Sequence, residues 1–173
     1  MVADTLGGYN FAGPSALMLN EEEQLILLLT NGLFDVWIQV LDPVTGSVIQ
    51  QVRHDDPDFR LFGVEILETE EGYVLMGRKR SGSYIRIFAW KLDKDFNILK
   101  EVVLEEGNYN HIYVEALVDS DGNIVMLTNQ HLGEFDYWRS AAIKFDPDLD
   151  AIWTTPVGDP QYHEEFSLSL IHI

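Results

Sequence analysis

The sequence has no cysteine, which excludes disulfide bonds, zinc–thiolate sites and cysteine nucleophiles. Basic residues are also few: 11 Lys and Arg stand against 29 Asp and Glu, for a formal net charge of −18. A chain this acidic is not expected to bind phosphate backbones, and we predict no nucleic-acid partner. Its one basic cluster, Arg78-Lys79-Arg80 followed by Ser81-Gly82-Ser83, is interpreted as the tip of a hairpin.

Long hydrophobic runs and helical patterns are missing as well. The longest apolar run, Leu25 to Leu29, is far too short to cross a bilayer, so we predict no membrane span. The first residues, Met1 to Thr5, lack the pattern of a signal peptide. No window combines an N-cap with apolar residues at helical spacing. With 46% hydrophobic and 12% aromatic residues, the chain is expected to fold into β-strands.

A repeat near 50 residues runs through the chain. An acidic turn precedes an apolar strand at Glu23, Glu71 and Asp121, in steps of 48 (71 − 23) and 50 (121 − 71) residues. A second marker, an aspartate that ends an apolar strand and begins a turn, recurs at Asp42, Asp93 and Asp146. A period near 50 that contains only strand signals is typical of propeller blades.

Each repeat divides into four strands. The predicted strands are 16–19, 25–30, 36–41 and 47–53, then 64–67, 73–77, 84–92 and 98–104, then 114–118, 124–128, 138–145 and 151–157. We therefore predict an all-β partial β-propeller of about three four-stranded antiparallel blades and the start of a fourth. The blades should span about 14–56, 62–105 and 112–158, with 159–173 as a fourth-blade start or an artefactual tail. A β-sandwich is the alternative.

The repeats also predict burial. Second strands such as Leu25 to Leu29 are apolar on both faces, which requires a neighbour on each face. Fourth strands are more mixed and should be partly exposed. The third-strand tryptophans Trp37, Trp90 and Trp138 are expected to pack between blades.

The chain contains too few repeats for a ring, because propellers close with about four to eight blades. We therefore expect the missing blades of the same protein as partners. The last six residues, Leu168 to Ile173, resemble the in-frame translation of a transposase adapter used for sequencing libraries. The alternative is a genuine strand at 166–173.

All three repeats resemble the tandem β-propeller repeats of bacterial secreted and surface proteins, in the kelch-like, quinoprotein-like and delta-60-like group. The third repeat carries this resemblance best, through Asp121-Gly122-Asn123, Asp136-Tyr137-Trp138, Lys144-Phe145-Asp146, Trp153 and Gly158. The first two depart from it, since Gln24 replaces the turn glycine and neither has the late tryptophan. The resemblance implies an extracellular or periplasmic location, and it assigns no quinone-binding residue.

Candidate chemistry is sparse. Asp93-Lys94-Asp95-Phe96-Asn97 and Asp146-Pro147-Asp148-Leu149-Asp150 alternate oxygen ligands like calcium loops. Neither has the glycine at position 6, and Leu104 and Val157 stand where the final glutamate would be, so hairpin turns are the better interpretation. Histidines 54, 111, 131, 163 and 172 are scattered, with His131 in the longest loop. The Glu164-Glu165 pair carries no specific signal for glycoside hydrolysis.

We therefore predict no catalytic, cofactor-binding or metal-binding residue, and the ligand-binding residues stay unknown. The predicted function is a non-catalytic binding or interaction module of a larger propeller protein, with an unknown protein or glycan partner. Its contact surface would be the loops 31–35, 78–84 and 129–137 on one rim. The alternative is a segment of a glycan-active or quinone-dependent propeller enzyme whose catalytic residues lie mostly outside this chain.

Overall fold

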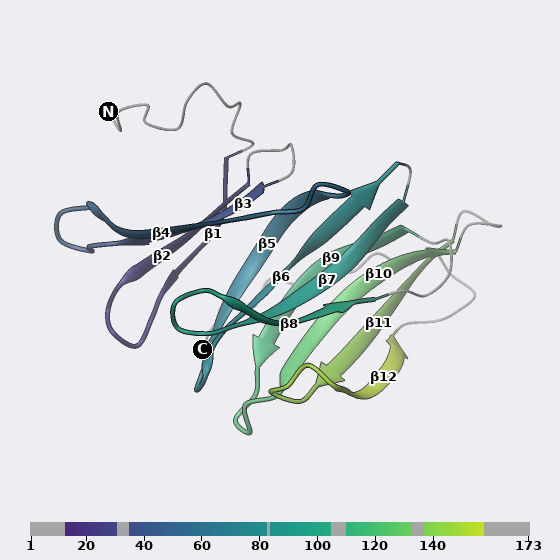
Figure 1. The fold of residues 1–173 in the computed structure, drawn as a ribbon. Helices are drawn as coiled ribbons and strands as arrows, with labels where there is room; N and C mark the ends of the chain where they lie inside the picture. Colours follow the sequence, from purple (N-terminus) through teal and green to yellow (C-terminus); the bar gives the residue numbers. More distant parts are fainter. Residues whose placement is uncertain (1–12, 31–34, 83, 105–109, 133–136, 158–173) are drawn as a thin grey trace.

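The computed structural model describes residues 13–30, 35–82, 84–104, 110–132 and 137–157, and every regular element in these ranges is a β-strand (Figure 1). The strands form three four-stranded antiparallel sheets, each built from consecutive strands in sequence order, and none of the three is closed. The all-β prediction is confirmed. No helix among the described residues is long and apolar enough to cross a membrane.

Sheet 1 consists of β1 Gly13–Leu19, β2 Leu25–Thr30, β3 Asp35–Leu41 and β4 Val48–Asp55. Sheet 2 consists of β5 Arg60–Thr69, β6 Gly72–Ser81, β7 Tyr84–Leu92 and β8 Ile98–Val103. Sheet 3 consists of β9 Asn110–Val118, β10 Ile124–Leu132, β11 Tyr137–Phe145 and β12 Ala151–Val157. The twelve predicted strands are thus present, in the predicted order.

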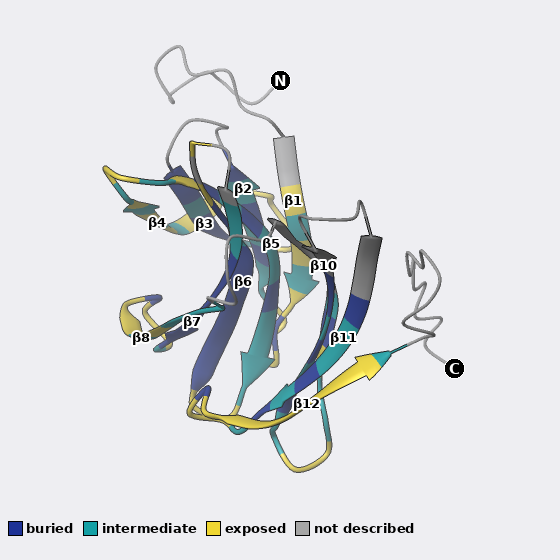
Figure 2. Ribbon diagram, turned by 90° about the vertical axis from the view of Figure 1, so that its right-hand side faces the viewer, coloured by how far each residue is buried: buried dark blue, intermediate teal, exposed yellow. Residues whose placement is uncertain are grey.

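The three sheets pack face to face, with sheet 2 in the middle (Figures 1 and 2). We call the space between sheets 1 and 2 junction 1–2, and that between sheets 2 and 3 junction 2–3. Successive side chains of a strand point to opposite faces, so β6 serves both junctions. Tyr73 and Leu75 belong to the core of junction 1–2, whereas Val74 and Met76 belong to that of junction 2–3. The predicted covering of both faces of a second strand is therefore confirmed for sheet 2.

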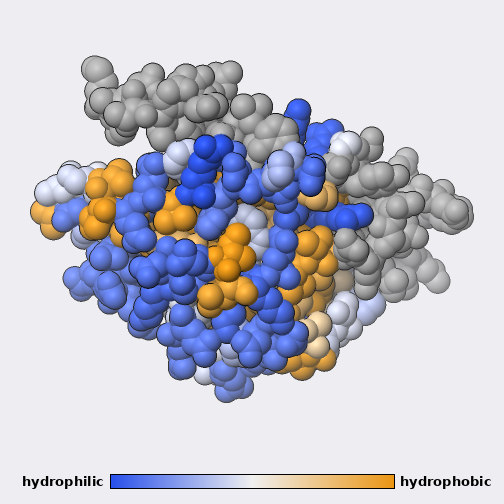
Figure 3. Space-filling model, in the orientation of Figure 1, coloured by the Kyte–Doolittle hydropathy of each residue, from blue (hydrophilic) through white to orange (hydrophobic). Residues whose placement is uncertain are grey.

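The two end sheets have apolar outer faces. In sheet 1, Leu17 and Leu19 are 63% and 60% exposed, and the register places Leu27 beside Leu17 on the same face. In sheet 3, Trp153 is 41% exposed. The face of the molecule seen in Figure 3 is mostly hydrophilic, with separate apolar patches between the polar side chains. The fourth strands β4 and β12 are largely exposed, as predicted.

Turns between strands are stabilised by aspartates. In the β3–β4, β7–β8, β9–β10 and β11–β12 turns, the first residue is an aspartate whose Oδ1 accepts backbone N–H groups two to four residues further on: Asp42, Asp93, Asp119 and Asp146. These bonds favour the charged carboxylate, and the pKa of Asp93 is lowered, mainly by the Asn97 side chain and backbone N–H. The aspartates recur because each hairpin needs its backbone donors satisfied.

Two of these turns also contribute to the core. Phe96 and Leu149 have φ values of 65° and 60°, and each is 1% exposed. A left-handed conformation costs a non-glycine residue roughly 1–2 kcal/mol, whereas burying such a side chain contributes about 1.5–3 kcal/mol. Phe96 stacks on Tyr73 with ring centroids 4.8 Å apart and lies in junction 1–2, and Leu149 lies in junction 2–3. Burial therefore offsets the strain.

Several strands are longer than predicted. β5 begins at Arg60 instead of Val64, because pairing with β6 continues past a register shift between Gly63 and Glu65. β6 extends to Ser81 instead of Gly77, and β10 to Leu132 instead of Thr128. The predicted loop 78–84 was therefore wrong, since Arg78 to Ser81 pair with β7, and most of the described part of 129–137 is strand as well.

Candidate functional site

A pocket of about 460 Å³ opens at junction 1–2, at the rim formed by the turns that follow the first and third strands. Its walls come from both sheets: the β1–β2 turn, β3 and β4 on one side, and the end of β5, the start of β6 and the β7–β8 turn on the other. The lining residues are Glu21, Glu22, Gln24, Val40, Gln50, Glu68, Gly72, Tyr73, Lys94, Asp95 and Phe96. Four of these side chains are acidic and one is basic, so the pocket has a negative potential.

Polar contacts fix the two sides of this pocket relative to each other. The Asn20 side chain donates to the Tyr73 hydroxyl at 3.2 Å, and the Glu21 backbone N–H donates to a Glu68 carboxylate oxygen at 2.9 Å. Gln50 donates from Nε2 to the backbone carbonyl of Asp95 at 3.5 Å. Burial raises the pKa of the Tyr73 phenol, and the carboxylates of Glu68 and Glu22 raise it further.

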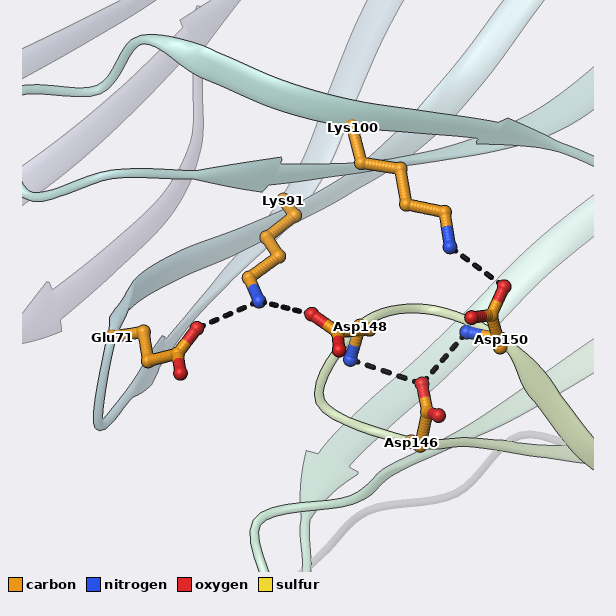
Figure 4. Close-up of polar contacts among 6 residues, drawn as sticks. All are labelled: Glu71, Lys91, Lys100, Asp146, Asp148 and Asp150. Carbon is orange, nitrogen blue, oxygen red and sulfur yellow. Dashed lines mark hydrogen bonds and ion pairs between the residues drawn. The ribbon is translucent and has the colours of Figure 1, made fainter.

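Junction 2–3 has ion pairs at the corresponding rim (Figure 4). The Lys91 ammonium lies 2.7 Å from a Glu71 oxygen and 2.6 Å from an Asp148 oxygen, so it joins the turns of two sheets. Lys100 makes a second bridge, 2.7 Å from Asp150. Because both carboxylates accept hydrogen bonds from it, the pKa of Lys91 is raised, with Asp148 as the larger cause.

Sheet 2 contains a buried cation near its β6–β7 hairpin. The Lys79 side chain is 7% exposed, and its ammonium pairs with Asp56 at 3.2 Å and with Glu101 at 2.5 Å. The ammonium also lies over the rings of Phe59 and Phe88, at 5.4 and 5.6 Å from their centroids. The middle residue of the basic cluster is therefore a structural core residue, which the interpretation of 78–80 as a hairpin tip did not predict.

Its two neighbours are more accessible. Arg80 is exposed and donates from Nε to the Gly82 carbonyl at 3.1 Å. Arg78 is half-buried over the Phe62 ring, and its Nε is buried without a hydrogen-bond partner among the residues that the structure describes. With Phe62 and Ile85, these two arginines line a second, smaller cavity of about 170 Å³. The β6–β7 hairpin thus presents positive charge on a protein of net charge −18.

Among the five histidines, only His54 lies where its side chain is described. It donates from Nε2 to the Phe96 carbonyl at 2.9 Å and meets the Trp90 ring edge-on at 5.3 Å. Burial lowers its pKa, although the bond to Phe96 opposes this shift. His111 and His131 lie in β9 and β10 with side chains outside the described residues, and His163 and His172 lie beyond the described ranges.

The structure places the two calcium-like segments in hairpin turns, where Asp93 and Asp146 accept hydrogen bonds from the backbone N–H groups two and four residues further on. In the described ranges, no group of three or more His, Asp or Glu side chains is arranged to bind a metal ion. Trp90 is buried in junction 1–2, as predicted, whereas Trp37 lies on the outer face of sheet 1 beneath Arg53. The Trp138 side chain and the Glu164-Glu165 pair lie outside the described residues.

No protein-family model matches the sequence. No curated protein matches it either.

Proposed function

We propose that this chain is a run of three consecutive blades of a β-propeller and that it serves as a non-catalytic binding module. The observation that supports the propeller is sheet 2, whose two faces are covered by two different sheets. A β-sandwich has two sheets, each with one face toward solvent. A middle sheet with two cores is the arrangement of neighbouring blades.

Strand order supports the same proposal. The first strands lie where the sheets meet, since β5 contacts β1 on one side and β9 on the other, whereas the fourth strands lie at the outer edges. In a propeller, first strands line the axis and fourth strands form the periphery. The outer-facing positions of β2, Leu25 and Leu27, correspond in register to Tyr73 and Leu75, which sheet 1 covers. We infer that a further blade covers the outer face of sheet 1 in the same way.

The variable rim supports the binding role. Counted between equivalent paired residues, the β2–β3 segment from Leu25 to Leu41 has 17 residues (41 − 25 + 1), whereas those from Tyr73 to Leu92 and from Ile124 to Phe145 have 20 (92 − 73 + 1) and 22 (145 − 124 + 1). The hairpins therefore differ in length beyond the shared core. Rigid scaffolds with variable connecting segments commonly carry binding sites. The described contact surface is the β6–β7 hairpin with Arg78 and Arg80, which favours an anionic partner such as an acidic glycan or protein surface.

The experiment is binding to an array of acidic and neutral glycans, with wild type compared with Arg80→Ser. We expect acidic glycans to bind and the variant to bind them more weakly, with Lys94→Ser, on the opposite rim, as the matched control. Equal binding by wild type and Arg80→Ser would show that the hairpin is not the contact surface. The propeller itself is tested by sequencing the source gene on both sides of this chain, where further repeats of about 50 residues are expected.

A further inference from the structure

The pocket at junction 1–2 lies at the same strand-register positions as the Lys91 and Lys100 ion pairs at junction 2–3. In sheet 1, Val40 pairs with Ile26 on one side and Gln50 on the other. In sheet 2, Lys91 pairs with Val74 on one side and Lys100 on the other. Ile26 and Val74 both point from a second strand toward the following sheet. Val40 and Gln50 therefore occupy the positions of Lys91 and Lys100.

The acidic partners of those lysines have counterparts at the pocket. Asp95 and Asp148 each stand two residues after the aspartate that begins the turn and directly before the left-handed residue, Phe96 or Leu149. On the other side of the junction, the β1–β2 turn contributes Glu22 to the pocket lining, as the β5–β6 turn contributes Glu71 to the lysine bridge. The two glutamates come from corresponding turns but stand one position apart in register, because Leu25 aligns with Tyr73. The carboxylates are thus conserved between the two junctions of this chain, whereas both bridging lysines are replaced by uncharged residues.

The space that remains has both an acidic and an apolar part. Val40, Phe96 and Tyr73 are 4%, 1% and 6% exposed, and they form a small apolar part of the lining of the pocket of about 460 Å³, which is otherwise mainly polar. In junction 2–3, the ammonium of Lys91 takes the corresponding place between two carboxylates at 2.7 and 2.6 Å. Lys94 is the basic residue of the lining, and it makes no ion pair with any described residue.

We propose that this pocket binds a primary alkylammonium group, with its cation between Glu22 and Asp95 and its hydrocarbon chain against Val40, Tyr73 and Phe96. The group can be the side chain of a lysine in a partner protein or a free amine, since the recognition chemistry is the same. An ammonium fits better than a metal ion, because the described acidic residues form no metal-binding group and part of the lining is apolar. Because sheets 1 and 2 alone form this pocket, ammonium binding does not depend on whether the chain is part of a propeller.

The first test is an NMR titration at low ionic strength with n-butylammonium chloride, with n-butanol and calcium chloride as the neutral and metal controls. We expect saturable amide shifts at the pocket residues for butylammonium alone. Loss of one carboxylate in Glu22→Gln or Asp95→Asn should weaken binding about fivefold, whereas Glu70→Gln, outside the lining, should not. Lys94→Gln should strengthen binding. Absence of saturable shifts, or binding by Glu22→Gln and Asp95→Asn that is as tight as that of wild type, would overturn the proposal.

Two further arms identify the occupant. A peptide with one lysine is compared with the same peptide carrying norleucine, and tighter binding of the lysine peptide than of butylammonium assigns the site to a protein partner. The variant Val40→Lys should restore the internal bridge and block butylammonium, whereas Val40→Met should leave binding within about twofold of wild type. A folded Val40→Lys protein that binds butylammonium as wild type does would overturn the proposal. The wild-type titration decides the question if that variant does not fold.

Discussion

Lys91 of β7 and Asp148 of the β11–β12 turn, 57 residues apart in sequence, meet at 2.6 Å across junction 2–3. The Lys91 side chain is 11% exposed and that of Asp148 is 73% exposed, so a largely buried cation reaches a solvated carboxylate. This contact joins two sheets whose remaining contacts at this junction are mainly apolar. Its removal should therefore be measurable as a change in stability that depends on pH and salt.

We expect Lys91→Met to unfold at a lower temperature than wild type at pH 7. Lys91 lowers the pKa of Asp148 below its ordinary 3.8, so the contribution of this carboxylate is complete above 3.8 and is lost as the pH falls through the lowered folded value. The difference between variant and wild type should therefore shrink in acid, as measured by calorimetry. Lys94→Met, an exposed lysine two residues after β7, is the control and should change little. Equal losses for both variants would contradict the bridge.

His54 should titrate below its ordinary pKa of 6.5, because burial against Trp90 lowers the pKa. A lowered folded pKa means that the contribution of neutral His54 is complete above pH 6.5 and is lost as the pH falls through the folded value. The NMR shift of the ring proton between the two nitrogens measures this pKa directly. A titration at or above 6.5 would show that the ring is not buried as described.

Leu75→Ala should cost about 2–5 kcal/mol, because Leu75 is fully buried in junction 1–2 and its removal leaves a cavity. Leu27→Ala, at the equivalent register position on the outer face of sheet 1, should cost roughly 1 kcal/mol or less in this chain. Denaturant unfolding measures both values. In a longer protein with a further blade beside sheet 1, the Leu27→Ala cost should rise toward that of Leu75→Ala. If the cost of Leu27→Ala were the same in the longer protein, no further blade would cover the outer face of sheet 1.

Gly77→Ala should strongly destabilise the protein. An added Cβ would lie 2.3 Å from the Phe62 carbonyl oxygen and 2.7 Å from the Phe88 ring, so the backbone or a core ring must move. We expect a loss of more than about 2 kcal/mol, in line with overpacked cores. Gly46→Ala is the matched control, since nothing lies within 4 Å of its added Cβ and only its φ of 69° opposes the change, at about 1 kcal/mol. Similar losses in both variants would contradict the close approach at Gly77.

The strands were predictable because local signals determine them. Alternating apolar residues between acidic turns gave β7 and β12 with the observed limits. The ends of β6 were not predictable in this way, because Arg78 and Lys79 resemble loop residues in sequence. In the structure, their cations lie over the rings of Phe62 and Phe88, and these contacts form only when the strands are paired.

The pocket could not be predicted from one segment, because its lining comes from four strands and two turns of two sheets. A partial signal was present, however. Aligning the repeats by strand register sets Val40 against Lys91 and Gln50 against Lys100, while the acidic turns remain. That comparison requires the pairing of third and fourth strands, which the sequence predicted only to within a few residues. The burial of Phe96 and Leu149 at turn positions was also missed, since acidic turns are expected to be exposed.

The left-handed turn residues have a consequence for how such arrays can change in length. Phe96 completes the junction on the N-terminal side of its own sheet, and Leu149 does the same one sheet later. The β3–β4 turn of sheet 1 instead has Gly46 as its left-handed residue and leaves Val44 90% exposed. The second and third repeats therefore each contain, in the turn after their third strand, the buried residue that packs in the junction with the preceding sheet. A gene duplication that adds one such repeat would also add the residue that packs this repeat against the preceding one. The existing repeats would then need no compensating substitution.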